Sequence, residues 1–517
     1  MKVTGITVLL IALSVQLCAE GSFSTEETLK RAASEIKLRN FKVAEQLLGE
    51  VLRNDPRSFI ALNLLGLVQL NEGRTAEARR AFEEATRINP AYAPAHVNLG
   101  NTLVMLKEED AALKEFLKAI ELQPKDALAL YNIGLIYGRQ GKFRMAAKYL
   151  NQAHVLAPSD KGITEALAGA TISSGKKLEA DALILQMANH GQLHAQLRES
   201  LAVLWLENGE PVRGVKLISD VPELASQFYQ VAFHKAKALL EEGGYAESAR
   251  ILEAIRLLQP PGAEFHDLLG SAYYLVDDPR KASDELQEAV RLEPTEPEHY
   301  FKLGMVFLKH RTIEPAVYVF ESGLKVRPDV PKLWMGLGLS YYLASKLDEA
   351  EKTLRQALAL DSKYEAVYIV LGDLLSQAGK VDEAVEVFRK AIDVGPGLYL
   401  PYYYYGQASA RQGKQNGEIT VQMMQKAIAL NPSFAEAHYE LGKALLQAGK
   451  IDDALAALKK SLELKPDLAQ SHYQLGQLYQ KLGNSTLASE HFRLFEAGNK
   501  KEAREDLIQR LDFRIEK

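Results

Sequence analysis

Small apolar residues recur along this chain at a constant spacing of 34 residues. Alanine stands at three of these positions, Ala168, Ala202 and Ala236. Glycine stands at ten others, the last two after a shift of two residues: Gly66, Gly100, Gly134, Gly270, Gly304, Gly338, Gly372, Gly406, Gly442 and Gly476. A fixed period between 20 and 50 residues indicates a stack of structural repeats and not one globular core.

Other positions follow the same period and divide each unit into two helices. A second small residue recurs further along each unit, as at Ala78, and a proline closes most units, as at Pro90. Polar turns such as Gln140-Gly141-Lys142 separate the two parts. Small residues allow two antiparallel helices to cross closely, and large ones such as Phe82 fill the remaining space. Proline cannot extend a helix interior, so it marks the break before the next unit.

This pattern resembles the tetratricopeptide repeat (TPR) family. Residues 331–364 match the family signature with Trp334, Leu337, Gly338, Tyr341, Ala350, Leu354 and Ala357. We count 14 repeats over residues 25–502, beginning at Thr25, Phe59, Ala93, Ala127, Lys161, Ala195, Tyr229, Ala263, Pro297, Pro331, Glu365, Tyr399, Ala435 and Ala469. The resemblance implies an all-α fold: an α-solenoid that forms a right-handed superhelix of helix-turn-helix repeats.

The predicted organisation has five parts: a signal peptide (1–21), repeats 1–5 (25–194), a degenerate sixth repeat (195–228), repeats 7–14 (229–502) and a C-terminal capping helix (503–517). In the middle repeats Gly214 and Ser248 replace the second alanine. The register is unbroken there, which favours a diverged stretch that still packs; a hinge is the alternative. An apolar stripe at Leu507, Leu511 and Ile515 predicts the cap, with a dimerisation helix as the alternative.

The first residues are typical of a secretory signal peptide. Lys2 precedes an uncharged apolar run, and Ala19 and Gly21 offer small residues for cleavage after either one. We therefore expect a secreted or periplasmic protein without a membrane span in the mature chain, because the run is short for a span. The alternatives are an uncleaved membrane anchor and a lipid anchor at Cys18, although Leu17 stands where bacterial lipoproteins have a small residue.

No pattern of catalytic or metal-binding residues emerges from the sequence. The net charge of −5 gives no basic footprint for nucleic acid, and phosphate-loop and HExxH motifs are absent. His190 and His194 are four apart and would share a helix face, but they lack a clear third ligand. Four histidines occupy the position of Trp334 and are interpreted as packing residues: His96, His266, His438 and His472. We expect no enzyme, no cofactor and no metal.

In the TPR family the first helices line a concave groove that binds extended peptides or partner helices, and the resemblance implies the same here. Asn98, Asn101 and Asn132 would form an amide ladder that grips a peptide backbone. Tyr402 and Tyr405 would lie in the core. The full set of predicted contact residues is Asn98, Asn101, Tyr131, Asn132, Tyr274, Phe301, Tyr342, Tyr403, Tyr404, Tyr439, Lys443 and Tyr473, in which the tyrosines offer rigid faces with polar tips.

The sequence thus predicts a non-enzymatic scaffold of the cell envelope that binds protein or peptide partners. A carbohydrate or cell-wall binder is one alternative, with sugars stacked on the tyrosines; a membrane-tethered assembly factor is another. The family's chaperone-docking site needs lysines at the positions of Val97 and Leu128, so we reject that partner.

Overall fold

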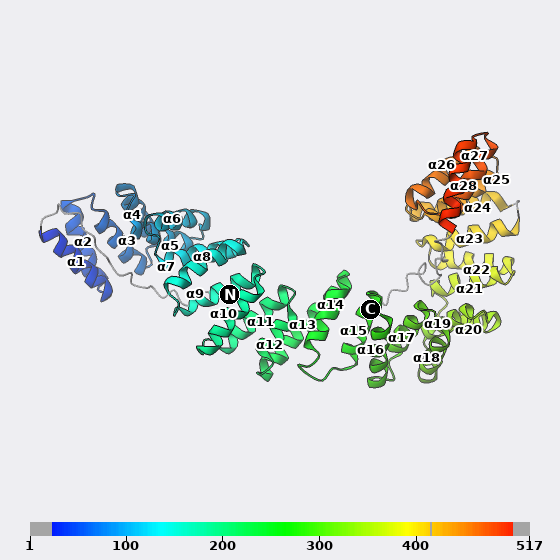
Figure 1. Cartoon of the computed structure of the whole chain (residues 1–517), viewed down its shortest axis with the longest axis horizontal. Coiled ribbons are helices and arrows are strands. Elements are labelled where there is room, and N and C mark those ends of the chain that lie inside the picture. Colours follow the sequence, from blue (N-terminus) through cyan, green and yellow to red (C-terminus); the bar gives the residue numbers. More distant parts are fainter. Residues whose placement is uncertain (1–22, 414–415, 500–517) are drawn as a thin grey trace. The chain divides into compact units, whose positions relative to one another are not determined.

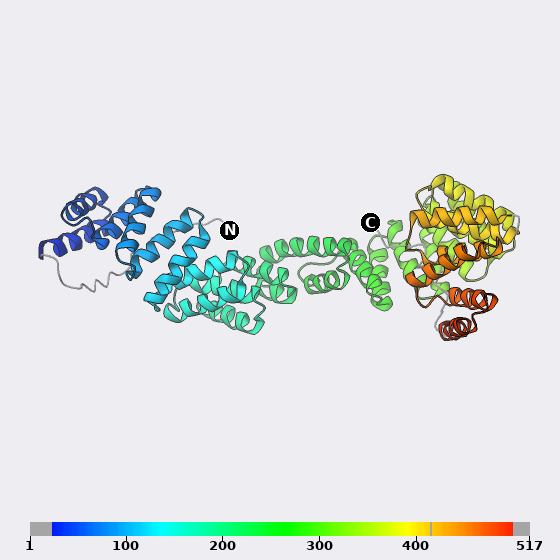
Figure 2. The same cartoon turned by 90° about the horizontal axis from the view of Figure 1, so that it is seen from above.

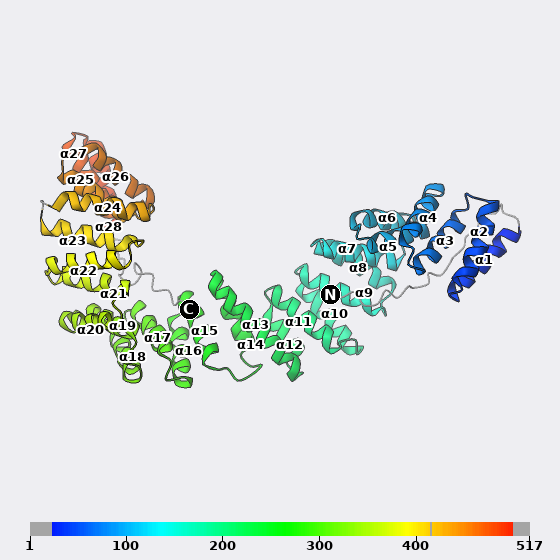
Figure 3. The same ribbon diagram turned by 180° about the vertical axis from the view of Figure 1, so that it is seen from behind.

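A computed structural model of the chain describes residues 23–413 and 416–499, which form 28 α-helices and no strand (Figure 1). The predicted signal peptide, Cys18 and the predicted capping helix 503–517 lie outside the described residues. Consecutive helices pack in pairs along the chain (Figures 1, 2 and 3). The predicted all-α repeat solenoid is therefore confirmed.

The chain divides into two compact units, residues 1–230 and 231–517, and the boundary falls within α13. The helices up to this boundary are α1 (Phe23–Lys37), α2 (Phe41–Asn54), α3 (Phe59–Asn71), α4 (Thr75–Ile88), α5 (Ala93–Met105), α6 (Glu109–Leu122), α7 (Ala127–Arg139), α8 (Phe143–Leu156), α9 (Lys161–Ser173), α10 (Lys177–Asn189), α11 (Ala195–Glu207), α12 (Pro211–Ile218) and α13 (Pro222–Glu242).

The second unit continues with α14 (Tyr245–Ile255), α15 (Ala263–Leu275), α16 (Pro279–Leu292), α17 (Pro297–Lys309), α18 (Ile313–Val326), α19 (Pro331–Leu343), α20 (Leu347–Leu360), α21 (Glu365–Gln377), α22 (Val381–Val394), α23 (Tyr399–Gln412), α24 (Gly417–Leu430), α25 (Ala435–Gln447), α26 (Ile451–Leu464), α27 (Ala469–Lys481) and α28 (Ser485–Asn499). The first helix of each pair carries the periodic glycine or its alanine substitute.

The periodic glycines lie where the two helices of a pair approach most closely. A Cβ atom at Gly66 would come within 2.5 Å of the Phe82 ring, and one at Gly442 within 2.6 Å of Leu458. Real Cβ atoms do not approach neighbours so closely, so the large side chain of the second helix occupies the space that the glycine leaves. In α18, the ring of Phe320 lies against two glycines, Gly304 of α17 and Gly336 of α19. The steric role that the sequence predicted for these glycines is confirmed.

The turn inside each pair needs one residue in the left-handed backbone region. This residue recurs with the repeat, and glycine supplies it at most sites, with φ values from 71° at Gly141 to 140° at Gly413. Five repeats use another residue at a φ of 57° to 64°: Arg39, Lys107, Asp277, Arg311 and Ser345. Glycine adopts this conformation without the steric penalty of a Cβ atom. The turn geometry is thus kept even where the sequence varies.

The fourth residue of many first helices closes the joint between repeats. A polar side-chain atom of this residue donates a hydrogen bond to the carbonyl oxygen of the residue six positions earlier, usually the closing proline, over 2.7–3.2 Å. The residues that do so are His96, Tyr300, Trp334, Tyr368, Tyr402, His438 and His472. Three of the four histidines that were interpreted as packing residues form this bond; the fourth, His266, is buried, and it bonds Glu285 instead, at 2.8 Å.

Two of these histidines face different groups with their Nδ1 atoms. In His96, Nε2 donates to Pro90 and Nδ1 lies 2.6 Å from a carboxylate oxygen of Glu115. Two acceptors favour the imidazolium, and the hydrogen bond to Glu115 raises the pKa of His96 above its ordinary value. In His472, Nδ1 lies 2.9 Å from Nδ1 of His491. That contact needs one bare nitrogen, so burial and then the charge of His472 lower the pKa of His491.

The sixth repeat departs from the predicted pattern. Its second helix, α12, has 8 residues, whereas α2, α4, α6 and α8 each have 14. The next helix, α13, begins at Pro222, so the predicted repeat start at Tyr229 is wrong. Pro222 explains this difference. A proline cannot continue a preceding helix such as α12, because it has no backbone N–H to donate, but it is favourable in the first turn of a new helix.

Both replacements of the second alanine have a packing reason. At Gly214, a Cβ atom would come within 2.7 Å of the carbonyl oxygen of Ala202. At Ser248, the buried hydroxyl donates to the carbonyl oxygen of Ala236 at 2.7 Å. The middle repeats therefore pack closely through different contacts.

Adding one methyl group to Gly304 tests the glycine contacts. We expect Gly304→Ala to lower the free energy of unfolding, because overpacking costs about 1–3 kcal/mol against a gain of roughly 1 kcal/mol in helix propensity. Gly49→Ala is the control, because Gly49 is helical and a Cβ atom added there would have no neighbour within 4 Å; it should stabilise. Urea unfolding with hydrogen exchange on α1–α2 and α17–α18 measures both, and stabilisation by both variants would contradict the steric argument.

The His472–His491 pair predicts an acid-sensitive end of the repeat stack. A histidine whose folded-state pKa is lowered adds stability above its unfolded-state pKa of about 6.5, and that stability is lost as the pH falls from this value through the lower folded-state pKa. The hydrogen-exchange protection factors of α28, which are corrected for the slower intrinsic exchange at low pH, should therefore fall between pH 7.5 and pH 5. His491→Gln should flatten this change and His438→Gln should not; an unchanged pH profile in His491→Gln would disprove the assignment.

Candidate functional site

Amide side chains link consecutive first helices in unit 1. Asn98 of α5 donates from Nδ2 to Oδ1 of Asn63 in α3, at 2.9 Å. Asn132 of α7 donates in the same way to Asn101 of α5, also at 2.9 Å. The predicted ladder thus consists of two bonded pairs, and Asn63 was missed. Asn98 is buried in its pair, whereas Asn101 and Asn132 stay partly exposed beside Tyr131.

Six of the twelve predicted contact residues are buried, so their expected exposure is wrong: Asn98, Tyr274, Phe301, Tyr342, Tyr403 and Tyr404. The clearest case is the tyrosine run of α23. Tyr403 and Tyr404 are 3% and 5% exposed, whereas Tyr402 and Tyr405, which we expected in the core, are half-buried. Tyr404 stacks on Phe388, with ring centres 5.6 Å apart, and Tyr403 meets the edge of Phe434 at 4.9 Å. Side chains of neighbouring segments therefore fill the space in which we expected a binding partner.

Tyr342 also serves the contact between first helices. Its hydroxyl donates to Asp373 of α21 at 2.5 Å, and Gln377 donates to the same carboxylate oxygen at 3.2 Å. Burial, then the charge and hydrogen bond of Asp373, raise the pKa of Tyr342 far above its ordinary value. The phenol therefore stays protonated, as a hydrogen-bond donor must.

A buried ionic cluster joins α15 to α17 and was not predicted. The carboxylate of Asp267 lies 2.9 Å from Nδ1 of His299 and 2.5 Å from Nζ of Lys302. Burial alone would raise the pKa of Asp267, but the hydrogen bond from His299 and the charge of Lys302 outweigh it, and the pKa is lowered. Burial lowers the pKa of His299, but its hydrogen bond to Asp267 outweighs that effect and the pKa is raised. This arrangement fixes a helix contact.

The first helices of the last two repeats, α25 and α27, carry tyrosine side chains that are held by neighbouring groups and remain partly exposed. On α25, the Nζ of Lys443 lies 5.5 Å from the ring centre of the half-buried Tyr439, while Glu440 pairs with Lys443 at 2.6 Å. On α27, Tyr473 is 38% exposed and packs against Phe495, and its hydroxyl accepts a hydrogen bond from Gln477 at 2.9 Å. We call Tyr439, Lys443, Tyr473 and Gln477 the tyrosine surface.

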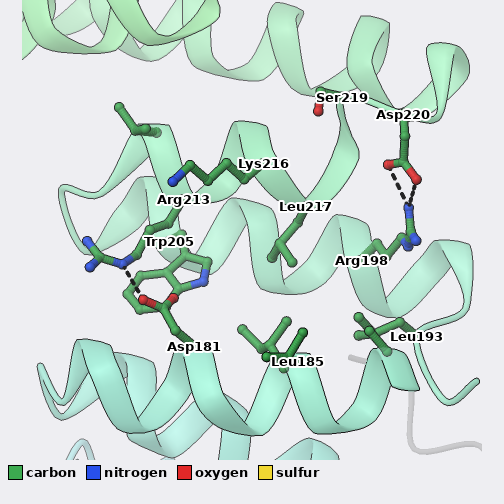
Figure 4. A pocket seen from close by; sticks show the side chains of 13 residues that line it. Asp181, Leu185, Leu193, Arg198, Trp205, Arg213, Lys216, Leu217, Ser219 and Asp220 are labelled. Atoms are coloured by element: carbon green, nitrogen blue, oxygen red, sulfur yellow. Dashed lines mark hydrogen bonds and ion pairs between the residues drawn. The ribbon is translucent and has the colours of Figure 1, made fainter. Parts of the chain in front are cut away.

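A hollow of about 560 Å³ lies between α10 and α12 in unit 1 (Figure 4). Leu185 of α10, Leu193 of the following loop and Leu217 of α12 point into it, and Trp205 of α11 lies beside them. An ion pair stands at each end of the leucines: Arg213 with Asp181 at 3.0 Å, and Arg198 with Asp220 at 2.7 Å. The hollow is lined mainly by α10, α12 and their loops, together with Arg198 and Trp205 of the first helix α11, and none of the predicted contact residues lines it.

The predicted shared helix face of His190 and His194 is not formed. His190 ends α10 and His194 caps α11, accepting from the backbone N–H of Leu197 at 3.3 Å. Within residues 23–413 and 416–499, no three His, Cys, Asp or Glu side chains are placed to hold a metal ion. In the same part of the chain, no helix has the length and apolar character that crossing a membrane requires.

Comparison with known families identifies repeats in several parts of the chain. The profile of the Cilia and flagella-associated protein 70 C-terminal domain matches residues 223–473. Tetratricopeptide repeat profiles match residues 29–93, 127–160 and 469–497, and a TPR repeat profile matches residues 108–141.

Curated relatives share parts of this array. Anaphase-promoting complex subunit 6 of Arabidopsis thaliana is 27% identical over 29% of this chain and 27% of its own length. The BBSome complex member BBS4 of Bos taurus is 21% identical over 54% of both chains. A probable UDP-N-acetylglucosamine–peptide N-acetylglucosaminyltransferase, SPINDLY of Hordeum vulgare, is 26% identical over 21% of this chain and 12% of its own. The chain thus spans about half or less of these relatives.

Among solved structures, that of the APC/C hetero-tetramer Cut9-Hcn1 is 16% identical, with a TM-score of 0.40 over 95% of this chain and 96% of that one. The repeat profiles, the 34-residue period and the tandem helix pairs agree with one another. The chain belongs to the tetratricopeptide repeat family.

Proposed function

We propose that this protein is a non-enzymatic scaffold that binds segments of partner proteins, and that the tyrosine surface of unit 2 is a principal contact. The observation that carries the proposal is the combination of fixed rings and accessible faces on α25 and α27. Tyrosines held by neighbouring groups lose little conformational freedom on binding, and an amphipathic ring can contact apolar and polar groups of a partner. Lys443 adds a cation beside the ring of Tyr439.

Two further observations support a scaffold. Two of the relatives are named as members of multiprotein complexes, the anaphase-promoting complex and the BBSome. In addition, the titratable clusters described above, Asp267 with His299 and Lys302 and Tyr342 with Asp373, are used to hold helices together. Binding through a repeat surface accounts for these features without any reaction.

Photo-crosslinking tests the tyrosine surface. A photoreactive phenylalanine in place of Tyr473 in the full chain should give discrete adducts in cells, and Tyr439→Ala should reduce their yield. Truncation of a central interface residue costs about 2 kcal/mol or more, which is about a 30-fold loss of affinity. The same photoreactive residue in place of Tyr318, a 70% exposed tyrosine on the second helix α18, is the control. Equal adducts at both positions, or none at Tyr473, would refute the proposal.

We also propose that residues 1–21 direct export, so that the scaffold works in the cell envelope or outside the cell. The support is the order of a basic residue, an apolar run and small residues in the sequence. Mass spectrometry of the purified native protein should find an N-terminus at Glu20 or Ser22. A retained Met1 would contradict cleavage. A lipid mass on Cys18 would show that the protein is anchored to a membrane and not released.

A further inference from the structure

Large apolar side chains are exposed at the hollow between α10 and α12. Leu185 of α10 is 63% exposed, and Val212 of α12, which also lines the hollow, is 52% exposed. At one side of the hollow α12 ends at Ile218, and the chain turns away at Ser219 and Asp220.

The charged side chains around the hollow are unequally paired. Asp181 and Asp220 are held by Arg213 and Arg198 respectively. Lys216 lines the same hollow and forms no ion pair with any residue that the structure describes. The group that complements this rim is therefore an anion, placed beside apolar side chains that fit against the leucines.

The backbone around the hollow favours a helical occupant. Both α10 and α12 satisfy their own backbone hydrogen bonds, so they offer no strand edge to which an extended peptide could add. An amphipathic helix brings its backbone bonds with it and binds through side chains alone, which suits an apolar groove. A volume of about 560 Å³ is also sufficient for several apolar side chains.

We propose that the hollow is a docking site for a short amphipathic helix of a partner protein, with apolar side chains against Leu185, Leu193 and Leu217 and a carboxylate at Lys216. This deepens the proposed scaffold function, on which it rests, by naming a second contact and the chemistry of its partner.

The probe is a labelled 14-residue peptide with the sequence of α6, EDAALKEFLKAIEL, which is an acidic amphipathic helix that this chain itself uses as a second helix. Fluorescence anisotropy with the full chain measures its affinity. In a Trp334→Phe background, the emission of Trp205, then the only tryptophan, reports binding at the hollow. We expect saturable binding with a change in Trp205 emission.

Matched variants locate the peptide. Leu185→Gln should raise the Kd at least about tenfold, since it removes a buried leucine contact. Leu178→Gln should change it less than about twofold, because Leu178 lies on the same helix, is 80% exposed and does not line the hollow. Lys216→Gln should weaken binding of the acidic peptide but not of a peptide with amides in place of its carboxylates. Circular dichroism confirms that the variants fold.

The outcomes separate this proposal from the scaffold function. Peptide binding should be unchanged in a Tyr439→Ala, Tyr473→Ala variant; a loss there would put the peptide on the tyrosine surface and overturn the hollow as its site while the scaffold function stands. Absence of saturable binding at millimolar peptide, or equal effects of the two leucine variants, also overturns the proposal. Binding of anilinonaphthalene sulfonate without competition from the peptide would make the hollow a small-molecule site instead.

Discussion

In the ten helix pairs that carry a periodic glycine, a large apolar side chain enters the space of the absent Cβ atom. Phe82 against Gly66 is the simplest example, and Phe320 between Gly304 and Gly336 extends the same contact from one pair to the next. A contact of this kind fixes the depth and angle at which two helices cross, because close-packed atoms cannot approach further. The 34-residue period of the sequence follows from repeating that contact, and the polar turns and closing prolines only have to allow it.

The contacts between consecutive first helices mainly hold the repeats together, and they leave few side chains free to bind a partner. Side chains that point along this row meet the neighbouring first helix, and the polar ones among them form bonds across the gap, as Tyr342 does with Asp373. A partner protein can contact only the few side chains that these hydrogen bonds leave exposed, such as Tyr473. The hollow beside the short helix α12 is a different surface, lined by apolar side chains of α10 and α12.

The sequence predicts those features that every repeat needs and fails at those that depend on a single neighbour. The glycine contacts and the structural histidines were readable because the period repeats them. The burial of Tyr403 and Tyr404 was not, since position on a helix face does not tell how near the next first helix lies. The contact of Asp267 with Lys302 left a signal, complementary residues 35 apart. The early start of α13 was visible in Pro222, but the assumption of an unbroken register concealed it.

The joint closed by the fourth residue of many first helices accepts tryptophan, tyrosine and histidine alike, because only reach and one polar atom are required. Aromatic identity at that position is therefore a poor measure of how well a unit is formed. A search that scores units by their tryptophan would undercount such arrays, whereas one that looks for a polar ring six residues after a helix break would recover them. Divergence within the chain can then proceed at this site without loss of its architecture.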